Sequence, residues 1–224
     1  MKIIHGIVEV PSVVWHTLNQ QAAPEIGYLK VNSFNERTGE QVKNALRELL
    51  VIHSISSLVL DLRDSDGMDL DAAVAVASQF LFLDGNENEN ENESDGPVVI
   101  TVCRDGTEVE VPIAHPLSDV AIRVPLAVLV NRRTAGAAEV VAGALQDYQR
   151  AVLIGEHTFG KGNVQQAYHL SDGSLLHITT AICLTPHRRP IHMIGLSPDI
   201  AVSSSDDPLI QAIRYLEEET GATQ

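Results

Sequence analysis

Two short apolar runs in the second half of the chain have the pattern of buried strands. Residues 125–130 (PLAVLV) and 151–155 (AVLIG) consist mainly of Val, Leu, Ile and Ala, which is typical of parallel strands covered on both faces. Between them, apolar residues recur at positions 137, 140, 141, 144 and 145, a spacing that predicts a helix with one buried face. The turn before this helix should lie at the carboxyl edge of the sheet, where open α/β sheets usually carry their sites.

The first half of the chain has a similar alternation. Residues 27–34 and 57–63 have the pattern of strands, and the segment between them predicts a helix that starts with a capping box formed by Thr38 and Gln41. The buried stripe of this helix is expected to consist of Val42, Ala45, Leu46, Leu49 and Leu50. Strand, helix and strand in this order predict a right-handed parallel crossover.

The remaining patterned segments predict strands at both ends of the core and a terminal helix. Residues 6–15 and 97–104 have strand patterns, and the polar stretch that follows, up to Pro116, indicates a β excursion. Residues 164–184 predict a hairpin that reverses at Asp172-Gly173. The tail predicts a helix over 207–219 whose inner face carries Leu209, Ile210, Ile213 and Leu216.

Composition limits the possible classes of protein. The 224 residues, 44% of them apolar, are enough to bury one sizeable core. A net charge of −15 disfavours nucleic acid and anionic membranes as partners. The chain has no apolar run near 18 residues and its start does not have the pattern of a signal peptide, so no membrane span is expected and a cytoplasmic location is the default.

Candidate metal and cofactor ligands are sparse. Cys103 and Cys183 lie 80 positions apart in apolar runs and are expected to be buried free thiols, and neither they nor the nine histidines show the spacing of a metal site. We therefore predict no metal and no cofactor. Residues 84–96 carry six acidic side chains in a low-complexity run and are expected to form a solvated, mobile loop, because they lack the pattern of a calcium-binding loop.

The stretch from 131 to 165 carries a family resemblance. Asn131, Glu139, the helix VVAGALQD and the loop TFGKGNVQ are similar to the signature of the C-terminal processing peptidases, or tail-specific proteases, which cleave peptides with a serine–lysine dyad. The resemblance implies that Lys161 stands at the general-base position and Gln165 at the position that orients it. The aspartate at the helix end corresponds to Asp147, which we expect to pair locally, with Arg150 as its candidate partner.

The nucleophile of the family is replaced. The serine of the pattern stands three residues before the glutamate, and this position is Gly136 here. Thr134 and Ala138 stand at the other two serine positions of the pattern. A serine–lysine mechanism needs an oxygen that attacks the carbonyl while the lysine takes its proton, and glycine offers none. The family usually has a non-catalytic small hydroxyl residue at the position of Thr134, so its hydroxyl needs no catalytic role.

A second block departs from the family in the same direction. The family's Asp-Leu-Arg is kept at 61–63, but the following turn, 64–68, has one glycine where two are usual. The resemblance implies that the oxyanion-hole donors are the amides of Gly67, or its neighbour, and Ala137. Met68 is expected to resist the backbone conformation that exposes these amides, and Asp64 and Asp66 are expected to place unfavourable charge there.

The resemblance covers residues 26–217 as one core domain, preceded by a strand and connector over 1–25. It implies an α/β fold of the ClpP/crotonase-like peptidase class, with a mixed, largely parallel sheet flanked by helices and a β-hairpin excursion. Family members usually carry an upstream PDZ domain, which the sequence as given does not include, so we expect either that the domain has been lost or that the chain is a fragment of a longer product. Family members also usually work outside the cytoplasm.

The sequence supports three interpretations of function. The first is an inactive peptidase-like domain that keeps a groove for peptides or unfolded protein segments. The second is an active serine-type endopeptidase that uses Lys161 with a displaced nucleophile. The third is a non-catalytic scaffold that acts through interactions such as homo-oligomerisation.

Overall fold

The computed structural model describes residues 11–18, 25–81, 96–114, 123–203 and 206–221. Most of the acidic segment expected to be mobile, at 84–95, lies outside these ranges, as do residues 1–10 and most of the connector expected before residue 25.

A six-stranded sheet forms the centre of the protein, in the order β1-β2-β3-β6-β7-β10. Its strands are β1 (Val13–Leu18), β2 (Ile26–Val31), β3 (Ser57–Asp61), β6 (Leu126–Val130), β7 (Val152–Gly155) and β10 (Ile200–Ala201). Only β1 runs antiparallel to its neighbour in this sheet. All five residues of β3 and of β6 are buried, as the uninterrupted apolar runs predict.

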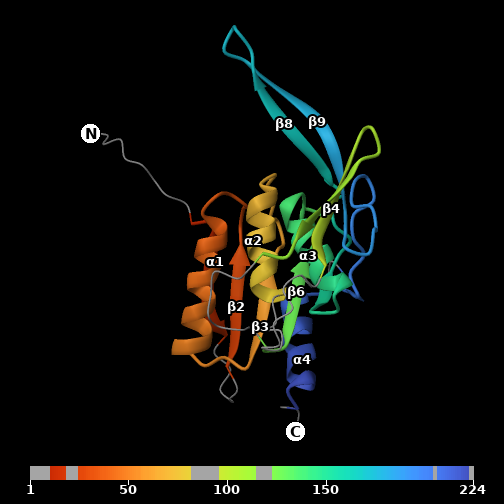
Figure 1. The fold of residues 1–224 in the computed structure, drawn as a ribbon. Helices are drawn as coiled ribbons and strands as arrows, with labels where there is room; N and C mark the ends of the chain where they lie inside the picture. Colours follow the sequence, from red (N-terminus) through yellow and green to blue (C-terminus); the bar gives the residue numbers. More distant parts are fainter. Residues whose placement is uncertain (1–10, 19–24, 82–95, 115–122, 204–205, 222–224) are drawn as a thin grey trace, which may run out of the picture.

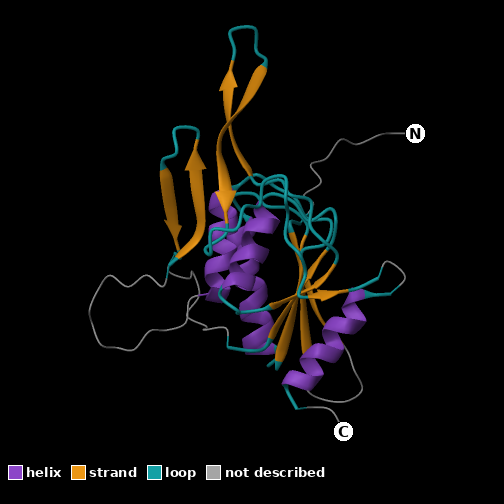
Figure 2. Ribbon diagram, turned by 90° about the vertical axis from the view of Figure 1, so that its right-hand side faces the viewer, coloured by secondary structure: helices purple, strands orange, loops and turns teal. Residues whose placement is uncertain are grey.

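Helices cover both faces of this sheet (Figure 2). On one face lie α1 (Thr38–Arg47), α2 (Leu70–Leu81) and α3 (Ala137–Asp147), whose apolar residues join the larger core cluster. On the other face lies α4 (Pro208–Glu219), which contributes Ala212 and Leu216 to a smaller cluster with Val59 and Leu129. The predicted α/β class with a mixed, largely parallel sheet flanked by helices is confirmed.

Two details of the predicted helices are wrong. Thr38 is the first residue of α1 and does not cap it, because its hydroxyl donates to the carbonyl of Ser33 at 3.1 Å and accepts from the amide of Asn35 at 2.9 Å. Beyond Arg47, α1 continues as a π-helical turn, Glu48–Ile52. In α4, Ile210 was predicted on the inner face but is 58% exposed, because Ala212 and Leu216 define the side that contacts the sheet.

A second, antiparallel sheet has the order β5-β4-β9-β8. Its strands are β4 (Pro97–Cys103), β5 (Glu108–Pro112), β8 (Asn163–His169) and β9 (Leu175–Leu184). Strands β8 and β9 form the predicted hairpin, which projects far from the body of the molecule (Figure 1). Cys103 and Cys183 lie on the neighbouring strands β4 and β9, and both are free; Cys183 is buried as predicted, whereas Cys103 is only half-buried.

Candidate functional site

The turn between β6 and α3 is held by a buried hydroxyl. The Oγ1 of Thr134 donates to the carbonyl of Leu62 at 2.9 Å and accepts from the amide of Asn131 at 2.9 Å, and the residue has no exposed surface. Because both bonds close the turn from inside, Thr134 is part of the scaffold of the site. Its hydroxyl does not face a substrate.

Gly136 occupies the position before α3 with a backbone that L side chains rarely adopt. Its φ is 63° and its ψ is −121°, and the residue is buried. A Cβ atom added there would lie 2.2 Å from the carbonyl oxygen of Gly67, which is closer than real Cβ atoms approach any heavy atom. The space that a nucleophile's side chain would need is therefore filled by backbone.

The same carbonyl oxygen engages the first amide of α3. The N–H of Ala137 donates to the oxygen of Gly67 at 2.9 Å, so the two positions expected to act together as donors face each other as donor and acceptor. Gly67 itself must be glycine, because a Cβ there would lie 2.7 Å from Cβ of Phe34. Because the Ala137 amide donates to the Gly67 carbonyl, it is not free to stabilise an oxyanion.

Glu139 joins the nucleophile turn to the lysine loop. Its Oε2 accepts from the amides of Gly136 at 3.1 Å and Lys161 at 2.8 Å. Its Oε1 accepts from the hydroxyl of Thr158 at 2.5 Å and the amide of Gly160 at 2.7 Å. A fully buried carboxylate needs such partners, and here they fix the backbone of Lys161 beside Gly136.

Lys161 lines a small pocket of about 20 Å³ at this edge of the sheet. The other lining residues come from the Gly67 turn, α3 and the second sheet: Gly67, Met68, Leu70, Gly136, Ala137, Val140, Asn163, Val164 and Cys183. Gln165 is not among them; it lies in β8 with an exposed side chain and pairs with Thr179. The structure thus gathers four of the five predicted site residues and leaves Gln165 outside.

Cys183 is a pocket residue that the sequence did not indicate. It comes from β9, and the only signal in the sequence was its place in an apolar strand. Burial, with a smaller contribution from the carboxylate of Glu139, raises the pKa of its thiol to about 11. The thiol is therefore protonated at neutral pH.

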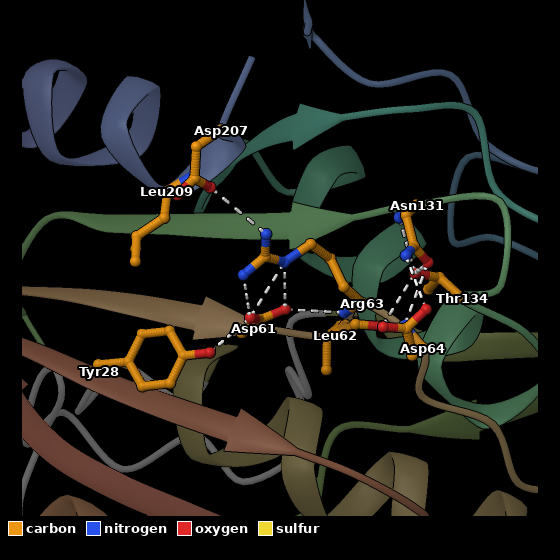
Figure 3. A network of polar contacts seen from close by, with 9 residues as sticks. All are labelled: Tyr28, Asp61, Leu62, Arg63, Asp64, Asn131, Thr134, Asp207 and Leu209. Carbon is orange, nitrogen blue, oxygen red and sulfur yellow. Dashed lines mark hydrogen bonds and ion pairs between the residues drawn. The ribbon is translucent and has the colours of Figure 1, made fainter. Parts of the chain in front are cut away.

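The two aspartates of the turn after β3 do not line the pocket. The carboxylate of Asp64 accepts from Nδ2 of Asn131 at 2.9 Å (Figure 3). It also pairs with Nε of Arg133 at 2.9 Å. Its φ of 60° is one that Asp tolerates better than most residues. Asp66 is exposed. Neither carboxylate therefore lies inside the pocket, where the sequence placed their charge, and the carboxylate of Asp64 is paired with Arg133.

The retained Asp-Leu-Arg block organises a buried polar network (Figure 3). Asp61, with no exposed surface, accepts from the hydroxyl of Tyr28 at 2.5 Å and from Arg63 through Nη2 at 2.6 Å and Nε at 3.0 Å. Burial, followed by the bond to Asp61, raises the pKa of Tyr28, and the bond to Asp61 raises the pKa of Arg63. Arg63 also lies 3.6 Å from Asp207, which ties the start of α4 to the end of β3.

Asp147 pairs with a different arginine from the one expected. Its carboxylate accepts from Nη2 of Arg189 and, at 2.7 Å, from the amide of His187. Arg150 instead donates to the carbonyls of Phe80 at 3.1 Å and Val124 at 3.0 Å, and burial lowers its pKa. Asp147 therefore anchors the segment after β9 to the end of α3.

A larger hollow of about 860 Å³ lies away from Lys161, at the start of α1. It is lined by Pro11, Ser12, Phe34, Asn35, Glu36, Arg37, Gln41 and Asp69. Within the described ranges, no three His, Cys, Asp or Glu side chains are grouped to hold a metal ion, and no helix is long and apolar enough to cross a membrane.

Comparisons with known proteins agree with this architecture. The sequence profile of peptidase family S41 matches residues 25–202. Carboxyl-terminal-processing peptidase 2, chloroplastic, of Arabidopsis thaliana is 36% identical over 177 residues, which are 79% of this chain and 32% of that protein. The carboxyl-terminal-processing protease of Synechocystis sp. is 37% identical over 185 residues, 83% of this chain and 39% of the relative. The chain thus spans about a third of the length of these relatives.

Solved structures give the same answer. The photosystem II D1 C-terminal processing protease superposes with a TM-score of 0.70 at 33% identity, covering 88% of this chain and 49% of that one. A putative S41 protease from Bacteroides fragilis has a TM-score of 0.71 at 20% identity, with 94% and 58% covered, which supports the fold alone. On the family match and these relatives, the chain belongs to peptidase family S41.

Proposed function

We propose that this chain is a C-terminal-processing-peptidase-like domain that binds extended peptide segments without cleaving them. The proposal rests on the position of the Gly67 carbonyl. Its oxygen occupies the place of a side chain at position 136 and accepts the amide of Ala137. Nucleophile and one oxyanion donor are therefore both missing, although Glu139 still holds the backbone of Lys161 in place.

Two exposed apolar side chains on segments bonded to the turns of the site support peptide binding. Phe159, 65% exposed, precedes the lysine loop, and its amide donates to the carbonyl of Thr134 at 3.0 Å. Met193, 83% exposed, is joined to the same loop through its amide, which donates to Gly160 at 2.8 Å. Large solvent-exposed apolar side chains beside a site are typical of surfaces that bind other chains. Unfolded segments offer the matching apolar side chains.

The alternative is an active enzyme with a displaced nucleophile, and the residues that line the pocket show which nucleophile it could use. Apart from Lys161, Cys183 is the lining residue with a nucleophilic atom. Its pKa of about 11 means that about one molecule in ten thousand carries the thiolate at pH 7. The residue is also only 4% exposed. Both facts oppose the use of Cys183 as a nucleophile.

The first experiment compares casein cleavage by the unmodified chain and by its Gly136→Ser, Lys161→Ala and Cys183→Ala variants. We expect no cleavage by the unmodified chain. Cleavage that survives repurification and is lost in Lys161→Ala would overturn the proposal, and loss in Cys183→Ala would name the displaced nucleophile. Cleavage by Gly136→Ser alone would show that only the nucleophile is missing.

A second experiment measures binding by the fluorescence anisotropy of labelled, unfolded casein fragments. Phe159→Ser should weaken binding at least about threefold, because covering about half of an aromatic side chain on binding is worth about 1 kcal/mol or more. Ile52→Ser is the matched control, since Ile52 is 72% exposed at the opposite edge of the sheet. Equal binding by all three proteins, or no binding by any, would contradict the proposed peptide surface.

A further inference from the structure

The hairpin of β8 and β9 extends beyond the body of the molecule (Figure 1). Every residue from 165 to 179, which we call the arm, is exposed. A two-stranded ribbon alone is at best marginally stable in water, because one pair of strands cannot bury a core of its own. A chain that covers one face of the arm would supply the missing burial.

One face of the arm, which we call the strip, is apolar. Cross-strand partners share a face, and Tyr168 pairs with Leu176 while Gln166 pairs with Ile178. The strip carries four large apolar side chains, each between 41% and 46% exposed: Tyr168, Leu170, Leu176 and Ile178. The other face of the arm carries Gln165, Ala167, His169, Leu175, His177 and Thr179.

The strip leads into the small pocket of the candidate site. In β8, alternation places Val164 on the same side as Gln166. In β9, one extra residue between Thr179 and Ala181 shifts the register, so that Ala181 pairs with Val164 and shares its side. Cys183 follows Ala181 by alternation, and both Val164 and Cys183 line the pocket. The strip and the wall of the pocket therefore belong to the same face of the ribbon.

Burial increases along this face from the tip of the arm to the pocket. The exposed fraction falls from 46% at Leu170 to 8% at Ala181 and 4% at Cys183. Val164 is partly buried and packs against the main core. Between Lys161 and Leu170 the chain has no Asp, Glu, Lys or Arg. An extended chain that leaves the pocket along β8 thus meets a continuous apolar surface without crossing a charged side chain.

Gln166 places a polar group among the apolar side chains of the strip. Its Oε1 accepts from the hydroxyl of Tyr168 at 2.8 Å. Its Nε2 has no partner among the described residues and can donate to a carbonyl. An extended peptide offers a carbonyl at every residue and turns alternate side chains to one face. Apolar contact with one amide donor is therefore suited to an unfolded segment.

We propose that a peptide bound at the pocket continues along the strip as an extended segment whose apolar side chains cover Tyr168, Leu176 and Ile178. This inference rests on the proposed function and adds the length and the composition of the peptide. Leu170 stands six positions after Val164, a distance of about 20 Å at about 3.3 Å per residue. A bound segment therefore needs about six residues beyond those at the pocket, with apolar side chains at alternate positions.

Fluorescence anisotropy with labelled, unfolded casein fragments of about 6 and about 20 residues tests the proposal on the full chain. Only the long fragment can contact the pocket and the strip together. Leu176→Ser should weaken binding of the long fragment at least about threefold and leave binding of the short fragment unchanged. Leu175→Ser is the matched control, because Leu175 is 52% exposed against 45% for Leu176 but lies on the other face. It should change neither affinity.

The outcomes separate the strip from the proposed function. If Phe159→Ser weakens binding and Leu176→Ser does not, the strip is overturned and peptide binding at the pocket stands. No binding of the long fragment by the unmodified chain overturns both. Equal weakening by the two leucine variants also overturns the strip. Circular dichroism and melting temperatures should show that both variants are folded. A dimer that Leu176→Ser alone disrupts in sedimentation velocity would assign the strip to a second copy and overturn the proposal.

Thiol protection locates the peptide directly. In a Cys103→Ser background, Leu176→Cys places an exposed thiol on the strip and Leu175→Cys places one on the other face. A saturating, cysteine-free long fragment should slow alkylation of Cys at 176 by iodoacetamide at least about threefold and leave alkylation at 175 unchanged. Protection at neither position, or equal protection at both, would contradict a peptide on the strip.

Discussion

The orientation of the peptide group between Gly67 and Met68 determines whether positions 136 and 137 can take part in catalysis. Its carbonyl points at Ala137, whereas its N–H would occupy that place if the group turned over. Such a reversal requires φ of Met68 to become positive, a value that Met68 does not have in this structure. Residues with a side chain resist this conformation and glycine does not. Met68, at a position next to the single glycine of this turn, therefore stabilises the closed arrangement.

The double variant Gly136→Ser with Met68→Gly tests this argument. Glycine at 68 frees the peptide group to reverse, which removes the oxygen that a side chain at 136 would strike. We expect the double variant to react with a fluorophosphonate probe at least about tenfold faster than Gly136→Ser alone, a gain of about 1.4 kcal/mol. Adding Lys161→Ala should abolish the reaction. Equal reactivity of the single and double variants would show that Met68 does not hold the site closed.

Substitution of Gly136 by alanine should destabilise the fold. The added Cβ meets the Gly67 oxygen at 2.2 Å and the backbone has a positive φ, so we expect a loss of about 2–5 kcal/mol in the free energy of unfolding. Gly173→Ala is the control, because Gly173 also has a positive φ, of 85°, but has nothing within 4 Å of a Cβ. Urea denaturation compares the two. Similar losses would mean that strain, and not the carbonyl, restricts position 136.

The buried thiol makes stability depend on alkaline pH. The pKa of Cys183 rises from 9.0 to about 11 on folding, so the folded state keeps a proton that the unfolded state loses above pH 9. Stability is therefore complete below pH 9 and falls as pH rises, by up to about 1.4 kcal/mol per pH unit. Urea denaturation from pH 8 to 10 should show this slope, reduced in Cys183→Ala but kept in Cys103→Ala. The range stops at pH 10 because Tyr28, whose pKa is also raised, contributes above it.

At the scale of elements, the start of α4 depends on one aspartate. The carboxylate of Asp207 accepts from the amide of Leu209 at 3.0 Å and faces Arg63 at 3.6 Å. Asp207→Ala should cost about 1–2 kcal/mol, most of it from the lost cap, because exposed ion pairs contribute little. Asp206→Ala, one residue earlier, removes the same charge without a cap and should cost less than about 0.5 kcal/mol in thermal unfolding. Equal shifts would indicate a general charge effect.

Elements with a clear period could be predicted from the sequence, and contacts between elements could not. The runs at β6 and β7 and the stripe of α3 lie where expected because burial on both faces, or on one, leaves a pattern in the residues themselves. The capping box at Thr38 failed because its hydroxyl found partners in the preceding turn. Arg189 as the partner of Asp147, and Cys183 beside Lys161, depend on how distant segments meet.

The same limit applies to the site. The fold brings Gly136, Ala137, Gly67 and Lys161, the positions that the family resemblance singled out, to one pocket. Met68 was the one signal in the local sequence for the orientation of the peptide group after Gly67, whereas the bond that its carbonyl accepts from Ala137 of α3 depends on how the two segments meet. Whether a retained loop is competent therefore has to be determined from contacts.

At the scale of the whole molecule, the acidic segment carries much of the uneven charge. Residues 84–96 hold six of the 30 acidic residues, and the sequence supports either a solvated insertion or, less well, a cation site. The described elements that flank it, α2 and β4, are well buried in the core without it. We therefore expect the segment to contribute almost nothing to the stability of the fold.

Calcium and charge removal separate the two interpretations. Replacing Glu87, Glu89, Glu91 and Glu93 with glutamine changes the net charge from −15 to −11 and removes four of the six carboxylates that could bind a hard cation. A solvated insertion predicts that millimolar calcium leaves the melting temperature of both proteins unchanged, and that the variant differs from the unmodified chain by less than about 0.5 kcal/mol. A cation site predicts a different result, because a ligand that binds only the folded state stabilises it by mass action. A melting temperature that rises with calcium in the unmodified chain, but not with magnesium and not in the variant, would show that the segment orders around a metal.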